Sequence, residues 1–282
     1  MFSGIIRMRK HARSKCVFAP LLRVGFCIAH LLMNYKLTIQ YDGTDFQGWQ
    51  IQDSRRTVQG ELTRALNLLE GRNVTVHGSG RTDAGVHAEG QIASVELQRG
   101  LAPERLRAAL NGNLPRDVRV FGAEIMPDDF HARFSAQGKT YLYRVVLGAV
   151  MSPFWERYAH QEARRLNVER MQTAARLFYG THDWTAFANA HTDAKTRVRT
   201  ITELSARVRD DAWAGAQMLE ITASADGFLR YMVRCLVGTL LAVGRDEIDE
   251  TVIRRAIEHG DRSLAGATAP PRGLTLLRVH YG

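Results

Sequence analysis

The sequence predicts an α+β fold of two similar halves, each with a mainly antiparallel sheet and helices packed on one face. Of the 282 residues, 45% are hydrophobic and 24% are charged, which is the composition of a folded globular chain. Stretches that alternate apolar and polar residues, as strands do, are separated by stretches with helical apolar spacing. This order occurs twice, and the composition excludes collagen-like, coiled-coil and disordered chains.

The first half, residues 34–148, opens with a strand at 35–41, where apolar residues alternate with polar ones so that one face is buried. The apolar side chains of residues 57–70 fall on one helical stripe, and Gly71 suits the end of such a helix. Proline suits the first turn of a second helix. The other expected elements of this half are strands near 74–78 and 91–97, a helix from Pro103 to near Gly112, and strands near 117–125 and 138–147.

The second half, residues 149–282, follows an expected linker between Gly148 and Gln161. The apolar stretch Phe228–Val243 contains two arginines and is too short to span a membrane, so it predicts a buried core helix. The other expected elements of this half are a helix capped by Asn167 and ended by Gly180, strands near 198–209 and 216–224, a short helix near 248–258, and a strand near 274–280.

Most of the net charge of +9 lies in residues 1–33, which carry six basic residues and no acid, so residues 34–282 carry only +3. The overall charge is therefore weak support for nucleic-acid binding. A basic run and an apolar run in residues 1–33 resemble a signal peptide, but Arg23 interrupts the apolar run and no small-residue cleavage site follows. We interpret residues 1–33 as a disordered extension or a wrongly assigned start, with Met33 as the natural start; a targeting segment is the alternative.

Cysteine usage favours a reducing compartment. The chain has three cysteines, too few for a disulfide framework, and two of them lie in residues 1–33. The rest of the chain contains only Cys235, which suits the cytosol.

The most unusual segment is GSGRTDAGVH, residues 78–87, directly after an expected strand. Its three glycines permit tight backbone geometry around Arg81 and Asp83. One interpretation is a surface loop in which these two residues merely pair. Another is a phosphate-binding loop, although the ending of a P-loop and the GxGxxG spacing are missing. A third makes Asp83 a nucleophile or general base that a guanidinium keeps ionised, and the residues alone leave all three open.

The same segment, with Ala88, resembles the catalytic loop of the tRNA pseudouridine synthase A family. Further matches follow in the family's order over nearly all of residues 34–282, whereas residues 1–33 have no counterpart. Because a ten-residue loop and several collinear motifs agree, the resemblance is highly specific. The other matching segments are YDGTDFQGWQ at 41–50, TVQ at 57–59, LP at 114–115, FHARFSAQGKTYLYR at 130–144, GTHDWTAFAN at 180–189, RTI at 199–201, GFLRYMVRCLVGTLLAVG at 227–244 and APPRGLTL at 269–276.

The resemblance implies a pseudouridine synthase fold with a catalytic cleft between the halves, and an isomerase that needs neither cofactor nor metal. Relatives convert uridine into pseudouridine in the anticodon stem-loop of tRNA, at positions 38–40, exchanging a C1′–N1 bond for a C1′–C5 bond. The matching nucleophile is Asp83, because a carboxylate is ionised at neutral pH and can form a covalent adduct. Attack on the ribose and addition to the base both stay open.

Three further residues match catalytic positions of the family. Arg81 matches an arginine near the flipped nucleotide, where a side chain can fill the space that the base leaves. Tyr141 matches a tyrosine that stacks on the target base and assists removal of the C5 proton; by itself it would be an ordinary strand aromatic. Arg234 matches an arginine that pairs with the aspartate, and its place in an apolar helix favours a carboxylate partner. At Cys235, many relatives carry Asn, so we expect a local change of packing.

Two clusters are expected to bind RNA. One interleaves aromatic and basic groups, as base stacking combined with phosphate binding requires. The other alternates basic residues, which in a strand would share one face and follow a phosphate backbone. Ordinary solvated basic patches are the alternative for both. The first cluster is Phe130, His131, Arg133 and Phe134, and the second is Lys195, Arg197 and Arg199.

The resemblance also implies a cytoplasmic homodimer in which one tRNA contacts both subunits, with no membrane association. His182 and Asp183 are adjacent potential metal ligands, but two do not make a site, so we expect a structural loop and no metal. Two other functions stay open. One is a catalytically idle RNA-binding or tRNA-folding module, against which the complete catalytic set argues. The other is a glycosidic-bond hydrolase, which usually needs two carboxylates.

Overall fold

The computed structural model describes Met1 and residues 32–282 except 191–193 and 213–214. Leu32–Gly282 form one compact unit. The expected extension at residues 1–33 therefore lies almost wholly outside the described residues. Met33, the expected natural start, is the first residue of strand β1 (Met33–Tyr41).

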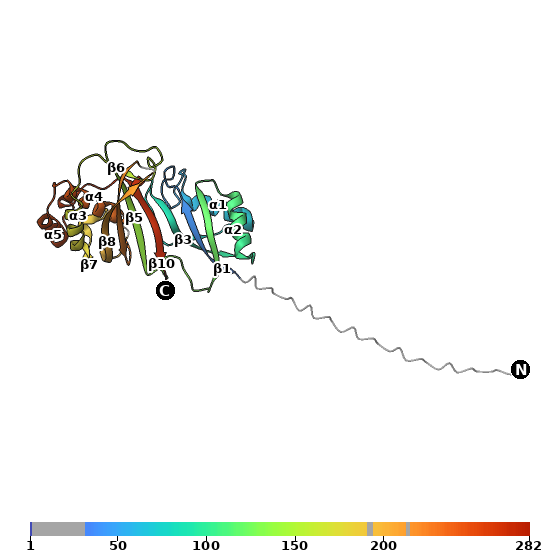
Figure 1. The fold of residues 1–282 in the computed structure, drawn as a ribbon. Coiled ribbons are helices and arrows are strands. Elements are labelled where there is room, and N and C mark those ends of the chain that lie inside the picture. Colours follow the sequence, from blue (N-terminus) through green and yellow to red (C-terminus); the bar gives the residue numbers. More distant parts are fainter. Residues whose placement is uncertain (2–31, 191–193, 213–214) are drawn as a thin grey trace. The chain divides into compact units, whose positions relative to one another are not determined.

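The described residues contain one mixed ten-stranded sheet in the order β4-β1-β3-β10-β5-β9-β8-β7, with β2 beside β3 and β6 beside β5 (Figure 1). The pairs β3–β10 and β5–β6 are parallel, and the others are antiparallel. The expected mainly antiparallel arrangement is confirmed. The strands after β1 are β2 (Val76–Gly78), β3 (His87–Leu97), β4 (Val118–Met126), β5 (Gly138–Leu147), β6 (His160–Glu162), β7 (Gly180–Asp183), β8 (Val198–Asp211), β9 (Ala216–Ala225) and β10 (Leu274–His280).

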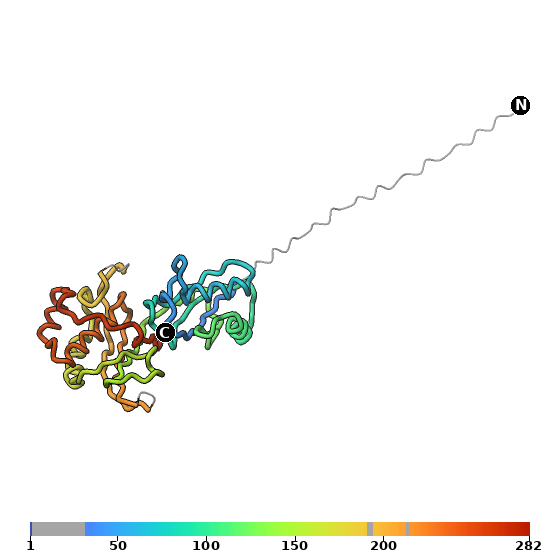
Figure 2. Tube along the Cα trace, turned by 90° about the horizontal axis from the view of Figure 1, so that it is seen from above, coloured from blue at the N-terminus to red at the C-terminus, as the bar shows by residue number. Residues whose placement is uncertain are grey.

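The last strand, β10, joins the two halves. It pairs in parallel with β3, where Thr275 lies opposite His87, and antiparallel with β5, where Leu276 lies opposite Tyr141. In the view from above, the C-terminus lies between the blue-to-green first half and the orange-to-red second half (Figure 2). The sheets of the two halves are thus one hydrogen-bonded sheet, which the sequence did not predict. The division into two domains after Gly148 stays a prediction.

Two helices pack on the strands of the first half, α1 (Val58–Glu70) and α2 (Pro103–Asn113). Thr57 caps α1, because its side-chain oxygen accepts a hydrogen bond from the backbone N–H of Gly60 at 3.3 Å. Gly71 ends α1 in the left-handed conformation, with φ 70°. Both expected helices are confirmed within one residue of their bounds.

Helix α3 (Val168–Ala175) begins where the sequence predicts and ends earlier. Asn167 caps it by accepting a hydrogen bond from the backbone N–H of Arg170 at 3.1 Å. The expected end at Gly180 is wrong, because the backbone tightens into a 3-10 turn that buries Phe178. The remaining elements are α5 (Glu250–His259) and the 3-10 turns η1 (Arg176–Phe178), η2 (Thr185–Phe187), η3 (Arg262–Leu264) and η4 (Pro271–Gly273).

Helix α4 (Met232–Gly244) is the expected buried core helix, and all of its residues except Arg234 are buried. The prediction that it begins at Phe228 is wrong. Tyr231 adopts a left-handed backbone with φ 66°, so the chain turns before the helix begins. Among the described residues, we find no helix that is both long and apolar enough to cross a membrane.

Candidate active site

The segment that carries Asp83 is a loop of residues 79–86 between β2 and β3. It packs against the segment after β1: the backbone N–H of Trp49 donates to the carbonyl of Thr82 at 3.1 Å. The hydroxyl of Thr82 lies 2.7 Å from that of Tyr41, which is buried. Gly48 has φ +87°, and a Cβ there would lie 2.6 Å from the Thr82 carbonyl oxygen, so only glycine permits this close approach.

The loop ends at His87, which is buried and forms hydrogen bonds with the backbone of Gly43 and of Arg157. Its Nδ1 accepts the backbone N–H of Gly43 at 3.0 Å, and its Nε2 lies 2.9 Å from the carbonyl oxygen of Arg157. Because Nδ1 accepts, the proton sits on Nε2, which donates to Arg157. The loop is therefore fastened to both halves of the chain.

Asp83 and Arg234 meet across the two halves. One guanidinium nitrogen of Arg234 lies 3.3 Å from Oδ2 of Asp83. The Nε of Arg234 donates to the carbonyl oxygen of Ala269 at 2.7 Å, which orients the guanidinium. The structure thus places the arginine of α4 against the aspartate of the loop, 151 residues away in the chain.

Burial and positive charge act on Asp83 in opposite directions. Its side chain is 22% exposed, and burial raises the pKa of the carboxyl above its ordinary value. The positive charges of Arg234 and Arg230 oppose this shift. The group is therefore a partly desolvated carboxyl whose ionised form is favoured by two arginines of the second half.

Tyr141 of β5 is 8% exposed and packs edge-on against Phe228, with ring centroids 5.2 Å apart. Burial raises the pKa of its hydroxyl, and charge on Tyr41 or Asp83 would raise it further. The phenol is thus neutral at physiological pH. It lies near enough to Asp83 for the two groups to interact electrostatically.

Arg81 is exposed, and its Nε donates to Oε1 of Gln50 at 2.9 Å. This bond links the catalytic loop to the end of the segment 41–50. The guanidinium that the described contacts place against Asp83 is that of Arg234.

The aromatic and basic cluster at 130–134 divides into packed and accessible side chains. Phe130 packs against Tyr281, with ring centroids 5.3 Å apart, and so belongs to the fold. Phe134 is 79% exposed, and the His131 ring lies 4.4 Å from it between centroids. The guanidinium of Arg133 lies 5.9 Å from the Phe134 ring. Arg133 and Phe134 are therefore the exposed members of this cluster.

The second basic cluster is not one strand face. Strand β8 (Val198–Asp211) begins where the sequence predicts, so of the three residues only Arg199 lies in it, and the condition for a shared face is not met. Arg197 instead donates to the carbonyl of Ala190 at 3.0 Å. Arg199 lies in β8 opposite His182 and donates to the carbonyl of Thr196 at 3.0 Å.

Sequence reasoning missed three residues that bear on the site. Lys139 donates to the backbone of the catalytic loop at Ser79, 2.9 Å away. Arg230 lies with its guanidinium 5.1 Å from the Tyr231 ring and acts electrostatically on Asp83. Phe228 contacts Tyr141. Lys139 stands two residues before Tyr141, and in a strand such residues share a face, which is a signal that could have found it.

The structural loop expected at GTHDW is wrong, because Gly180–Asp183 pair with β8 as strand β7 and Trp184 precedes the 3-10 turn η2. His182 Nε2 lies 2.9 Å from the carbonyl oxygen of Tyr179. Asp183 accepts hydrogen bonds from the backbone N–H and the hydroxyl of Thr185. Within the described part of the chain, no three His, Cys, Asp or Glu side chains form a group that could hold a metal ion.

Cys235 is buried and free, and its sulfur lies 3.4 Å from the hydroxyl of Thr268. It therefore packs against the segment that carries the Ala269 carbonyl, the acceptor of Arg234. The packing change expected at this position therefore lies beside the hydrogen bond that orients Arg234, and Arg234 still contacts Asp83.

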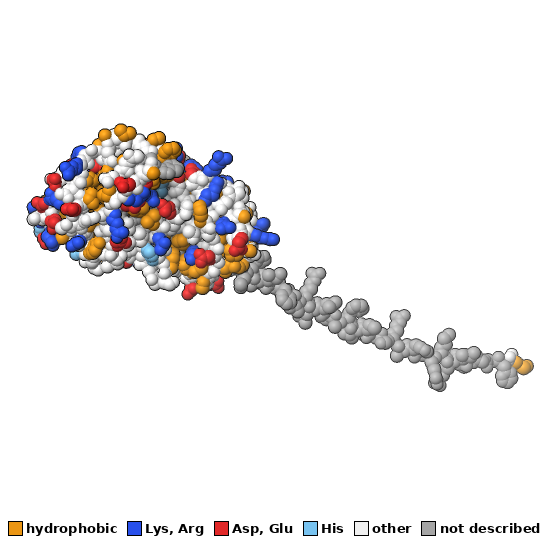
Figure 3. Space-filling model, viewed as in Figure 1, with side chains coloured by type: hydrophobic (Ala, Val, Ile, Leu, Met, Phe, Trp, Pro, Cys, Tyr) orange, Lys and Arg blue, Asp and Glu red, His pale blue; other side chains and the backbone are white. Residues whose placement is uncertain are grey.

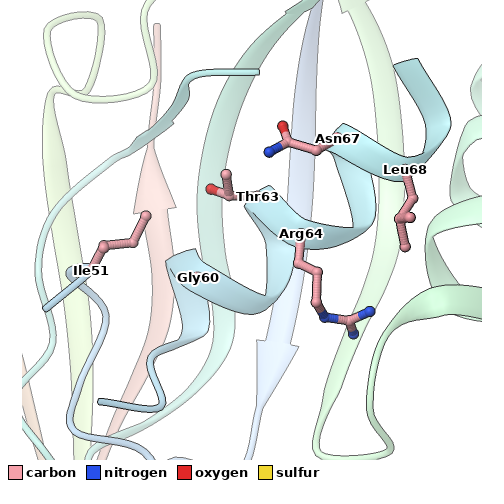
Figure 4. Close-up of a pocket in the computed structure, with 6 residues that line it drawn as sticks. All are labelled: Ile51, Gly60, Thr63, Arg64, Asn67 and Leu68. Atoms are coloured by element: carbon pink, nitrogen blue, oxygen red, sulfur yellow. The ribbon is translucent and has the colours of Figure 1, made fainter. Parts of the chain in front are cut away.

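Neither the surface charges drawn in Figure 3 nor the hollow drawn in Figure 4 marks the expected site. On the face drawn in Figure 3, basic side chains are interspersed with acidic ones instead of forming one basic field. A shallow hollow of about 460 Å³ lies on α1 and contains none of the expected site residues (Figure 4). Its lining residues are Ile51, Gly60, Thr63, Arg64, Asn67 and Leu68.

The sequence matches the family model described as tRNA pseudouridine synthase over residues 37–135 and 174–282. A tRNA pseudouridine synthase A from Geobacillus is 43% identical over 247 residues, covering 87% of this chain and 97% of that protein. One from Streptococcus pneumoniae is 42% identical over 251 residues, covering 89% and 99%. A crystal structure of a Cbf5-Nop10-Gar1 complex matches with 10% identity and a TM-score of 0.33, covering 86% of this chain and 57% of that chain. A TM-score of 0.33 is too low to support an argument.

The fold and the site define a pseudouridine synthase, with an aspartate in a tight loop that an arginine of the other half contacts. The chain belongs to the tRNA pseudouridine synthase family, whose members isomerise uridine to pseudouridine in tRNA.

Proposed function

We propose that this protein isomerises uridines of the tRNA anticodon stem-loop, at positions 38–40, with Asp83 as nucleophile and with neither cofactor nor metal. The observation that carries the proposal is the contact of 3.3 Å between Asp83 and Arg234, at the tip of a loop fastened to both halves. A carboxylate in that place is oriented, partly desolvated and kept available by a cation.

The reaction conserves atoms. On one route, an oxygen of Asp83 bonds to C1′ while the C1′–N1 bond breaks; C5 of the turned base then displaces that oxygen. On the other route, the oxygen adds to C6 of the pyrimidine ring, the C1′–N1 bond breaks, the base turns and the C1′–C5 bond forms, and the bond between Asp83 and C6 then breaks to release the carboxylate. On both routes C5 loses its proton and N1 gains one, so no water is consumed. Tyr141, neutral and beside Asp83, would stack on the base and assist the transfer of the C5 proton.

RNA binding would use the accessible basic and aromatic groups near the site. Arg133 and Phe134 are exposed side by side and suit phosphate binding with base stacking. Arg81, held by Gln50 at 2.9 Å, would enter the space left by the extruded nucleotide. Contributions from the other members of the two clusters, His131, Lys195, Arg197 and Arg199, are proposed on the same grounds, and Phe130 would act by supporting the segment.

The assembly and compartment are also proposals. We expect a homodimer in which one tRNA contacts both subunits, because the family resemblance implies it, and light scattering of the purified chain would measure it. The cytoplasm suits a chain whose residues 34–282 hold only Cys235, a buried free thiol. A monomer that is fully active would contradict the dimer proposal.

The replacement Asp83→Asn tests the nucleophile. It preserves the size of the side chain and removes the ionised oxygen, so pseudouridine formation should fall by at least about 10⁴-fold while tRNA binding stays within a few-fold. Release of tritium from C5 of labelled uridine in tRNA measures the reaction, since the C5–H bond must break. Asp210→Asn, on β8, is the matched control and should stay active. Full activity of Asp83→Asn, or free uracil as the product of the wild type, would contradict the proposal.

A further inference from the structure

Lys139 lies beneath the start of the catalytic loop. It belongs to β5, where Ala225 of β9 and Val279 of β10 lie opposite it. Its ammonium donates to the carbonyl oxygen of Ser79 at 2.9 Å. Tyr141 stands two positions further along the same strand, so both side chains leave β5 on one face. One strand thus supplies the tyrosine of the site and a support for the loop.

The environment of this ammonium is unusual, because the cation is held by a carbonyl and not by a carboxylate. In the described part of the chain, no Asp or Glu side chain pairs with Lys139. Burial lowers the pKa of Lys139 to about 8, and the positive charges of Arg133 and Arg199 lower it further in the same direction. Keeping a charge in such a place is costly, which favours a role beyond packing.

Gly80 is shaped around the same ammonium. A Cβ at residue 80 would lie 2.3 Å from Nζ of Lys139, closer than any real contact allows. The glycine beside Ser79 therefore leaves the space that the ammonium fills. The carbonyl of Gly80 is held by Gln91, whose Nε2 donates to it at 3.1 Å. The backbone at 79–80 is thus fastened on two sides, three residues before Asp83.

We propose that Lys139 is a positioning residue for the nucleophile: its ammonium binds the Ser79 carbonyl, fills the space beside Gly80 and so sets the path of the backbone that carries Asp83. The inference rests on the proposed function of Asp83. A displacement of about 1 Å in a reacting group can lower a rate by about 10²-fold, so the loss of this support should reduce the chemical step more than binding.

The replacement Lys139→Met removes the charge and the donor while keeping a chain of similar length. We expect kcat for tritium release from tRNA to fall about tenfold or more, with KM and the dissociation constant for tRNA within about threefold of wild type. Lys139→Arg keeps a charged donor and should recover most of the loss. Lys36→Met is the matched control. Lys36 is also a strand lysine, on β1, but its ammonium pairs with Glu124 of β4 at 3.0 Å.

A double-mutant cycle makes the test specific for the contact with Gly80. In the wild-type background, Gly80→Ala should lower kcat, because its methyl group would collide with the ammonium. In the Lys139→Ala background the same methyl meets open space, so Gly80→Ala should cause little further loss. Far-ultraviolet circular dichroism of each variant confirms folding. If Lys139→Met fails to fold, the comparison of kcat between Gly80→Ala and wild type still tests the contact.

Three results would overturn the inference: a kcat of Lys139→Met within twofold of wild type, a loss confined to KM, or additive effects in the cycle. A loss confined to KM would make Lys139 a phosphate contact. Failure of the proposed function is a separate outcome, because the wild-type chain itself would then leave tRNA unmodified or Asp83→Asn would stay active. The Lys139 variants are compared only against a wild type that forms pseudouridine.

Discussion

At the scale of single residues, the chemistry depends on how Asp83 keeps its charge in a partly buried place. Burial raises the pKa of the carboxyl, and the two arginines of the 230–234 turn and helix oppose that shift. Arg234 acts through a contact of 3.3 Å, whereas Arg230 acts without a hydrogen bond to the carboxylate. The reactive, ionised form is the one that these cations favour.

Replacement of Arg230 by Met should therefore move the acidic limb of the pH–rate profile. With one cation gone, the pKa of Asp83 rises further, and the carboxyl is protonated at a higher pH during acidification. The measurement is kcat for pseudouridine formation against pH, in which the acidic limb of the variant should lie at higher pH than that of wild type. Arg254→Met, at an exposed position of α5, is the control and should leave the limb in place. An acidic limb at the same pH as in wild type, or at a lower pH, in Arg230→Met would contradict the effect of Arg230 on the pKa of Asp83.

At the scale of elements, the catalytic loop is placed by close contacts at two glycines, and the one at Gly48, which is with backbone, requires glycine. Gly48 has φ +87° and lies against the Thr82 carbonyl, and Gly80 makes room for Lys139. These requirements explain why the glycines stand in both matching motifs, 41–50 and 78–88. A loop held by backbone contacts of this kind keeps its side chains in place without a large core of its own.

The replacement Gly48→Ala should displace the loop and lower kcat about tenfold or more. The added methyl would lie 2.6 Å from the Thr82 carbonyl oxygen, and an L-residue at this φ is strained. Gly112→Ala in α2 is the control, because a Cβ there meets nothing within 4 Å; it should leave kcat unchanged and stabilise the helix by about 0.5–1 kcal/mol. Steady-state kinetics and thermal unfolding check both variants. Equal kcat values for the two would contradict the role of Gly48.

At the scale of the whole molecule, the C-terminal strand makes one sheet out of two halves. Strand β10 lies between β3 and β5, and Leu276 within it is 1% exposed. The loop of Asp83 precedes β3, whereas Tyr141 lies on β5 and Arg234 follows β9. The last strand of the chain therefore lies between the elements that supply the site.

Because β10 couples the halves, Leu276→Ala should destabilise both together. The lost side chain is fully buried, so the free energy of unfolding should fall by about 2–5 kcal/mol in a single cooperative transition. Trp49 and Trp184 are buried in the first and second half, and fluorescence of variants in which one of them is the single tryptophan left of the chain's four reports each half during urea unfolding. Two separate transitions, with only one of them shifted, would show instead that the halves unfold independently.

Much of the secondary structure could be predicted because its signals are local. The cap at Asn167 and the stop at Gly71 stand where the sequence predicts them. The start of α4 was misplaced, because Phe228 continues the apolar pattern while the left-handed Tyr231 turns the chain. The alternation of Lys195, Arg197 and Arg199 does not make one face, because residues two positions apart share a face only where the backbone is extended, and β8 begins at Val198.

The sequence by itself determined the family, the expected nucleophile and most elements, because motif identity, caps and apolar spacing are properties of neighbouring residues. Only the tertiary structure decided that Lys139 contacts Ser79 and that β10 joins the halves. The physical reason is that these contacts depend on strand order and backbone path, which arise from the packing of the whole chain, and no local pattern specifies them.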